Sequence, residues 1–544
     1  MPIKALKGFF SLHQHRIVLL LILSAAAVGV AEIISATPFG PGIGSDAVVY
    51  ITSARNLLAG RGLGLIEPDG AFRLLPYFPP FYPLVLSALG LFVKDLVSGA
   101  RWMNALLFGG LIAVMGYAFY RYTRSTIFSV VLSWMLAFST VLINVSVWAM
   151  SEPVSLFVGF AGLIFLLIFL DNQKQRYFSL SALFTGLAFL SRYASVAFIM
   201  TGCLVLMLFI HGKIGRKIGK AVQYGAIVLL PMVIWFVIDV SMTGTLGSRS
   251  SQNLSDIPAR AIELILPLKV AFYEWTPFVL PVSRWIRQPY FRIGLMVIAL
   301  VIAWAVIRAV KSIPQRNQQD SNKDIGLAFL ATMCIFGMFY LVMIVVTYIF
   351  TFPPITLSDR MFSPLIVAYL AIIAWLGFIL TRGFRSWKWV RGLVVCVMLL
   401  FMITYGLAAK AEIKEISMDG LGYNGRVYRQ SALIDYVKTI PETTPLITNK
   451  APMLLFFTGR SAYTVQEVFN PKDHEDFVPY GMEQNDEAQR VFREEGGALV
   501  LFNSIIDDFV GLYGEEQGWA RYNIFVQGLR SPYQADDGQV YYYR

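Results

Sequence analysis

The polar residues best placed for chemistry are few, and they stand at turns between long apolar runs. Asp46 begins a predicted amphipathic helix, which Ser45 is expected to cap and Gly60 to end. The apolar face of this helix comprises Ala47, Ile51, Ala54 and Leu58. A carboxylate here can act as a general base toward a hydroxyl or amine. The alternative is an acid favoured at a helix start by about 0.3–1 kcal/mol. Tyr50, one turn further on, can reach what Asp46 contacts and is predicted to position a reactant.

Two arginines stand where apolar sequence is interrupted. Arg192 lies in LSRYAS between two apolar half-stretches, and Arg360 lies in SDRMFSP just before another apolar run. An arginine at the centre of a membrane span costs about 2.5–3.5 kcal/mol and therefore needs a partner. Because a guanidinium fork suits paired phosphate oxygens, we predict both as phosphate ligands. Snorkelling of Arg192 and interfacial anchoring of Arg360 are the alternatives.

Two further charged residues begin apolar runs. Glu152 in MSEP is predicted to position a reactant or to pair with an arginine, although a glutamate before a proline is also common at a helix start. Arg101 in GARWMN has a predicted positioning role, with a structural or interfacial role as the alternative. No metal site is predicted, because the opening loop lacks a DxD pair and the four histidines are scattered. The sequence also has no P-loop and no GxGxxG placed after a predicted strand.

The elements that carry these residues are predicted to be membrane spans. The 544 residues are 56% hydrophobic and only 15% charged, against about 25% charged in soluble domains. The fold class is therefore a polytopic α-helical membrane protein with about eleven transmembrane helices (nine to thirteen). The net charge of +11 comes from short loops and does not indicate nucleic acid. The predicted spans are 17–36, 102–120, 126–146, 154–170, two within 178–210, 221–239, 291–309, 326–350, 361–380 and 392–409.

The basic loops predict the orientation. With the N-terminus in the cytoplasm and eleven spans, every strongly basic short loop falls on the cytoplasmic side. The transmembrane domain is then 1–410, with a first outer loop at 38–101 and a second at 241–290. Both outer loops are predicted to carry amphipathic helices along the membrane surface. Residues 411–544 regain charge and are predicted to form a small extracytoplasmic α/β domain.

The motifs SDAVVY, PPFYP, GARWMNALL and SDRMFSP, in this order among many spans, resemble the GT-C membrane glycosyltransferases. The resemblance is to the branch of protein O-mannosyltransferases and lipid A aminoarabinose transferases, as a bacterial member in the inner membrane of the cell envelope. It implies a polyprenyl-phosphate-linked sugar donor, inversion at the anomeric carbon, and the base role for Asp46. Many members have two adjacent acids in the loop, whereas here Ala47 follows Asp46.

We therefore expect a glycosyltransferase that moves a hexosyl or pentosyl group outside the cytoplasm. Sugar nucleotides are made in the cytoplasm, so an enzyme outside needs a lipid carrier. Arginines can stabilise the departing lipid phosphate without a metal. The acceptor is open between a protein, a lipid and a cell-wall polymer. A transporter or flippase of the lipid-linked sugar is the alternative, and a scaffold that binds cell-wall components is a third class.

Overall fold

The computed structural model describes residues 3–75, 78–210, 212–244, 250–251, 257–275, 296, 300, 321–352, 355–383, 388–465, 479–480 and 487–543. The chain forms two compact units. The first comprises Met1–Pro38, Tyr77–Val85 and Val97–Met418, and the second comprises Phe39–Pro76, Leu86–Leu96 and Asp419–Arg544. The segment 38–101, predicted to be the first outer loop, is therefore divided, and most of it belongs with the C-terminal residues. The functional division at 410/411 stays a prediction.

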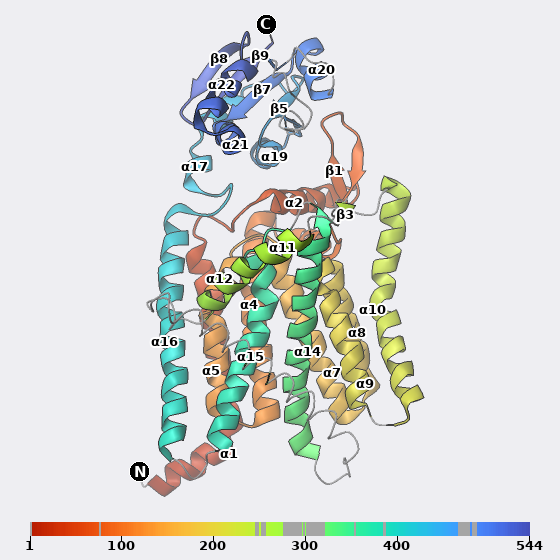
Figure 1. Ribbon diagram of the computed structural model, residues 1–544, viewed down its shortest axis with the longest axis vertical. Coiled ribbons are helices and arrows are strands. Elements are labelled where there is room, and N and C mark those ends of the chain that lie inside the picture. The colour runs from red at the N-terminus through yellow and green to blue at the C-terminus, as the bar shows by residue number, and fades with distance from the viewer. Residues whose placement is uncertain are drawn as a thin grey trace. The chain divides into compact units, whose positions relative to one another are not determined.

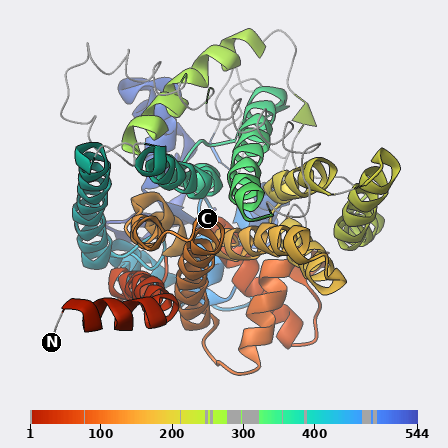
Figure 2. The ribbon, with the colours of Figure 1, turned by 90° about the horizontal axis from the view of Figure 1, so that it is seen from below.

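The first unit is a bundle of long, apolar helices, which Figure 2 shows nearly end on. It consists of α1 (Ile3–Ala36), α4 (Leu96–Thr123), α5 (Thr126–Ala137), α6 (Thr140–Ser146), α7 (Glu152–Asn172), α8 (Gln175–Ser191), the short 3₁₀ turn η1 (Tyr193–Ser195), α9 (Val196–Phe209), α10 (Ile214–Thr243), α11 (Ile257–Glu263), α12 (Ile265–Glu274), α14 (Ser321–Phe350), α15 (Asp359–Gly383) and α16 (Lys388–Asp419). The helix α7 is the most buried of the candidate spans, whereas α10 and α16 lie at the margins. A short strand pair, β3 (Ser250–Ser251) and β4 (Thr351–Phe352), joins the second predicted loop to the end of α14.

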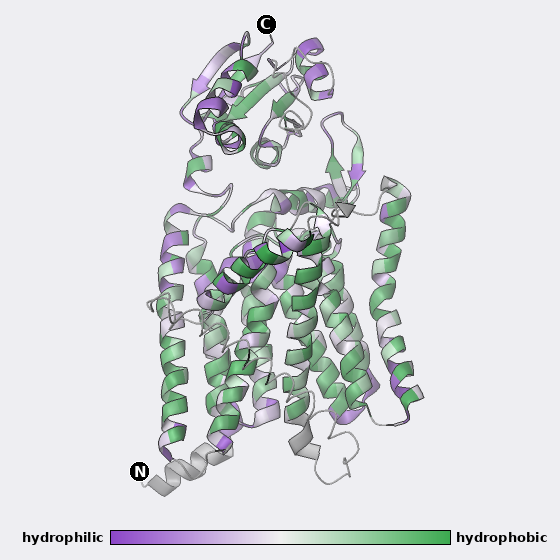
Figure 3. Ribbon diagram, in the orientation of Figure 1, coloured by the Kyte–Doolittle hydropathy of each residue, from purple (hydrophilic) through white to green (hydrophobic). Residues whose placement is uncertain are grey.

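The helices confirm a polytopic helical membrane protein. Seven helices in the described residues are long and apolar enough to cross a membrane, and the bent pair α5–α6 raises the number to eight. Figure 3 shows their hydrophobic character along most of their length. The two spans predicted within 178–210 are the shorter helices α8 and α9. The span predicted at 291–309 lies outside the described residues apart from 296 and 300, so the total of eleven stays a prediction.

Close packing of small and aromatic residues fixes the centre of the bundle. A Cβ placed on Gly162 of α7 would lie 2.5 Å from the Thr185 hydroxyl of α8, so these two backbones approach closely. The rings of Phe160, Phe198 and Phe336, one each from α7, α9 and α14, contact one another with centroids 4.4–5.3 Å apart. Dense packing of this kind holds the ends of α7, α8 and α14 in fixed relative positions.

The second unit contains the helix that carries Asp46. This helix, α2 (Ser45–Leu58), begins one residue earlier than predicted, with Gly44 in extended backbone as its N-cap, so Ser45 is inside the helix and does not cap it. The buried residues include Ala47, Ile51 and Ala54, as predicted, whereas Leu58 is exposed. A hairpin of β1 (Gly64–Ile66) and β2 (Phe72–Leu74) follows. The next helix, α3 (Phe81–Gly90), is divided between the two units.

The C-terminal residues form the predicted small α/β domain around one mixed sheet (Figure 1). Its strand order is β6-β5-β7-β9-β8, in which β5, β6 and β7 are parallel and the last two strands are antiparallel to their neighbours. The strands are β5 (Leu446–Thr448), β6 (Tyr463–Thr464), β7 (Ala498–Phe502), β8 (Arg530–Ala535) and β9 (Gly538–Tyr542). The helices are α17 (Arg426–Arg429), α18 (Ala432–Val437), α19 (Ala451–Thr458), α20 (Glu487–Glu494), α21 (Ser504–Tyr513) and α22 (Glu515–Phe525).

Backbone pairing joins the first loop to this domain within the second unit. Ile43 forms a β-bridge with Gly422, and its carbonyl accepts from the Tyr423 amide at 2.8 Å. The buried Asn424 donates from Nδ2 to the Pro41 carbonyl at 2.7 Å. The helices α2 and α19 also pack together. The residues immediately before Asp46 are therefore held by the segment that follows α16.

Candidate active site

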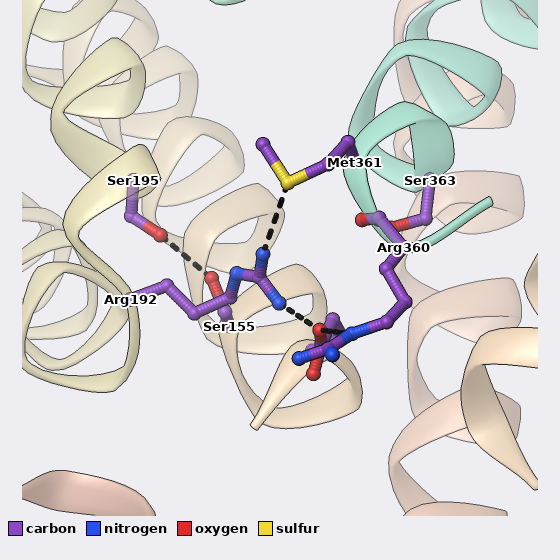
Figure 4. Close-up of polar contacts among 7 residues, drawn as sticks. Ser155, Arg192, Ser195, Arg360, Met361 and Ser363 are labelled. Atoms are coloured by element: carbon purple, nitrogen blue, oxygen red, sulfur yellow. Dashed lines mark hydrogen bonds and ion pairs between the residues drawn. The ribbon is translucent and has the colours of Figure 1, made fainter. Parts of the chain in front are cut away.

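Three charged residues from distant parts of the chain meet in the first unit. Glu152 Oε1 accepts from Arg360 Nε at 2.6 Å and forms an ion pair with Arg192 Nη1. Figure 4 shows the two guanidinium groups reaching inward from opposite sides, with Arg192 also directed toward the Met361 sulfur. The convergence of the two arginines, which the sequence alone leaves open, is thus a feature of the fold. Their role as phosphate ligands stays a prediction.

Each residue of this cluster occupies the end of a helix. Glu152 is the first residue of α7, and the proline that follows it suits a first turn because it has no amide hydrogen to donate. Arg192 follows α8 in extended backbone (φ −152°, ψ 133°), which interrupts the helix as the LSRYAS turn predicts. Arg360 is in the first turn of α15. Because α7 and α15 both begin here, their positive dipole ends add to the arginine charges.

Burial makes the cluster electrostatically strong. The side chain of Glu152 is 2% exposed, that of Arg192 is 17% exposed, and that of Arg360 is 38% exposed. The side chains of Glu152, Arg192 and Arg360 together carry a formal charge of +1. The second carboxylate oxygen, Oε2, is buried and has no hydrogen-bond partner among the described residues. A site with one excess positive charge and one solvent-reachable arginine can accept an anion.

A small cavity of about 10 Å³ adjoins the cluster, close to the least that holds one water molecule. Its walls include Ser155 and Ser195, whose hydroxyl oxygens are 2.6 Å apart. Tyr340 of α14 and Ser363 of α15 complete the polar side of the lining. Sequence reasoning missed these four residues. The signal available was weak, since a serine or tyrosine within an apolar run is usually a packed or locally satisfied residue.

The other predicted site residues have separate surroundings. Arg101 donates to Thr37 Oγ1 at 2.9 Å and to the Ile34 carbonyl at 2.6 Å, so its charge lies at the C-terminal end of α1. Asp46 and Tyr50 are in α2 of the second unit, where Asp46 is partly exposed and Tyr50 is buried. The structure does not test the predicted base and positioning roles. Within the described residues, no group of three or more His, Cys, Asp or Glu side chains is arranged to hold a metal ion.

The fold of this multi-pass membrane protein is that of the GT-C glycosyltransferases, matched over nearly the full chain. The archaeal oligosaccharyltransferase AglB from Archaeoglobus fulgidus, in complex with an inhibitory peptide and a dolichol-phosphate, matches with a TM-score of 0.53 and 12% identity. The match covers 91% of this chain and 71% of that chain. The apo form of the A. fulgidus oligosaccharyltransferase matches with a TM-score of 0.52 and 12% identity, over 96% and 74% of the two chains.

ArnT from Cupriavidus metallidurans bound to undecaprenyl phosphate gives a TM-score of 0.48 and 14% identity, over 96% of this chain and 98% of that one. No protein-family model matches the sequence, and no curated protein does. The two matches with TM-scores above 0.5 confirm the predicted GT-C fold, although their sequence identity is only 12%.

Proposed function

We propose that this protein is an inverting glycosyltransferase that moves a sugar from a polyprenyl-phosphate-linked donor to an acceptor outside the cytoplasm. The observation that carries the proposal is the convergence of Arg192 and Arg360 on Glu152 at the ends of three membrane helices. The fold supports the same class. The oligosaccharyltransferase of this fold was solved with a dolichol-phosphate, a lipid phosphate of the kind proposed here.

The charge of the cluster suits the proposed donor. A sugar joined to a lipid phosphate is a phosphodiester with one negative charge, opposite in sign to the formal +1 charge of these three residues. When the sugar leaves, the lipid phosphate gains a second negative charge. Two arginines stabilise this charge more strongly than that of the donor, which is the condition for catalysis. Arg360, the more exposed of the two, is proposed to meet the phosphate first.

The proposed chemistry is a single displacement. The acceptor oxygen or nitrogen bonds to the anomeric carbon, while the bond from that carbon to the phosphate oxygen breaks and its electron pair leaves with the lipid phosphate. The acceptor proton passes to Asp46 as general base. Tyr50, Glu152 and Arg101 are proposed to position the reactants, with Glu152 acting through the arginines. No metal is required in this scheme, since the arginines take the leaving charge.

Release of polyprenyl phosphate tests the proposal. Purified full-length protein in detergent is given a panel of polyprenyl-phosphate sugars with mixed acceptors, and the released lipid phosphate is measured for wild type and Asp46→Asn. We expect release by wild type and a loss of about 10²–10⁴-fold in the variant, the usual contribution of a general base. Donor binding should persist, because Asp46 is not a proposed phosphate ligand.

Glu67→Gln is the matched control, since Glu67 is a carboxylate in the same loop that pairs at 3.5 Å with Arg73 on the hairpin. It should retain wild-type release. If Asp46→Asn kept wild-type activity, Asp46 would not be the general base, and it would be explained as an acid favoured at a helix start. Saturable donor binding without release from any sugar would favour a transporter of the lipid-linked sugar instead.

A further inference from the structure

A second, larger cavity lies at the other end of α15. It has a volume of about 780 Å³ and is bounded by the start of α5, the end of α15 and the start of α16. Its lining residues are Ser125, Ile127, Phe128, Phe378, Thr381, Arg382, Lys388, Arg391, Gly392, Val395 and Cys396. The three helices come close together at Gly377, where a Cβ would lie 2.7 Å from both Phe128 and Met398. The cavity opens beyond this point toward the helix ends.

The cavity is basic at its rim. Arg382, Lys388 and Arg391 line it and are exposed, and none of them forms an ion pair with a described residue. Among the described residues that line the cavity, none is acidic. Ser125 and Thr381 also line the cavity. This arrangement favours an anion with several acceptor oxygens, such as a phosphate group.

The walls of the cavity are apolar, which favours an anion that also carries an apolar group. Phe128, Phe378 and Val395 line the part between the helices, and Ile127 is 53% exposed. The outer surface of α16 continues this apolar surface, with Leu393 56% exposed. A free phosphate uses the cationic rim alone, whereas a glycerophospholipid also covers the apolar wall with its acyl chains.

We propose that this cavity binds the headgroup of an anionic glycerophospholipid, with an acyl chain along α5 and α16. The site differs from the Glu152 cluster, because Arg360 and Arg382 are at opposite ends of α15. Twenty-two residues of helix separate them by about 33 Å, close to the thickness of the bilayer hydrocarbon core. Basic pockets between membrane helices bind anionic headgroups on the cytoplasmic side, where the basic loops of this chain are predicted to lie.

Lipid binding to the purified full-length protein tests this proposal. Native mass spectrometry after mild delipidation counts the lipids that remain bound on titration with phosphatidylglycerol. The test variant carries Arg382→Gln, Lys388→Gln and Arg391→Gln. The control carries Lys174→Gln, Lys213→Gln and Arg216→Gln, which remove the same charge from exposed positions at the starts of α8 and α10. We expect at least tenfold weaker binding of one lipid in the test variant and no change in the control.

A variant that keeps every charge provides a second test. A Cβ on Gly392 would meet no atom within 4 Å, and this residue lines the cavity, so Gly392→Leu fills the space without a backbone clash. It should weaken lipid binding while leaving the thermal stability of the delipidated protein unchanged. If the test and control charge variants lost lipid binding equally, the lipid would be attracted by the overall positive charge of the protein. That result would overturn the proposed site. Displacement of the lipid by millimolar inorganic phosphate, or equal binding of phosphatidylcholine, would overturn the assignment to an anionic lipid.

Discussion

The guanidinium of Arg360 donates to the carboxylate of Glu152 at 2.6 Å, although the two residues are 208 positions apart in the sequence. Glu152 is almost fully buried, and Arg360 is reached by solvent. A buried carboxylate therefore holds an accessible cation at one end of the helix bundle. Because the two residues differ in exposure, we expect their replacement to have different effects on stability and on activity.

Replacing Glu152 by Gln should destabilise the protein. The change removes the buried anionic partner of the half-buried Arg192, and breaking a buried ion pair costs about 3–5 kcal/mol. We expect a lower melting temperature in detergent, with a larger rise on addition of polyprenyl phosphate than in wild type, since the added anion replaces the lost charge. A melting temperature and a ligand response equal to those of wild type would contradict this role for Glu152.

The two arginines should respond differently to replacement by Lys. Arg192 is the less exposed of the two and also contacts the Met361 sulfur, so Arg192→Lys should lower both the melting temperature and transfer. Arg360 is more exposed, so Arg360→Lys should chiefly affect donor use. Loss of one charge-assisted bond predicts a loss of about 10–100-fold in kcat/KM. Steady-state kinetics beside thermal unfolding separate the two effects. Equal melting temperatures for the two variants would contradict the distinction.

Asn424 should hold in place the segment that precedes Asp46. Asn424→Ala removes a hydrogen bond to Pro41, and the orphaned carbonyl costs about 1–3 kcal/mol. We expect faster amide hydrogen exchange at Ile43 and in the first turn of α2. Asn503→Ala is the matched control, because Asn503 donates to the Asp536 carbonyl at 2.7 Å elsewhere in the same domain. Unchanged exchange at Ile43 in the Asn424 variant would exclude this anchoring role.

Arg101 offers a choice between two predicted roles. Arg101→Gln weakens the contacts with Thr37 and the Ile34 carbonyl, so a structural role predicts a stability loss of about 1–3 kcal/mol with kcat retained. A positioning role predicts a fall in kcat at unchanged melting temperature. Thermal unfolding and kcat measured on one preparation decide between them, with Arg73→Gln as a surface control of equal charge.

The sequence could predict features that depend on local pattern. The break at Arg192 and the helix containing Asp46 each leave a signal within about ten residues. The helix α16 was harder to bound, because it runs to Asp419 after the apolar stretch ends near 409. Its last two turns carry charged helix formers, which composition assigns to the following domain.

Long-range relationships could not be predicted in this way. The pairing of Glu152 with both arginines depends on how α7, α8 and α15 pack, and no spacing in the chain encodes it. Tyr340 has the pattern of a core aromatic residue, and only the packed bundle shows that it lines the cavity beside Arg192. The pairing of Ile43 with Gly422 likewise joins segments that have no periodicity in common.

The packing of α2 against α19 also has a consequence for biosynthesis. Roughly 400 residues separate the two helices, and a ribosome adding about 5–20 residues per second needs some 20–80 s to make them. During that interval the helix with Asp46 has its neighbouring strand β1 but lacks its contact with α19. The contact of α2 with α19 can therefore form only after the membrane helices between them have been translated.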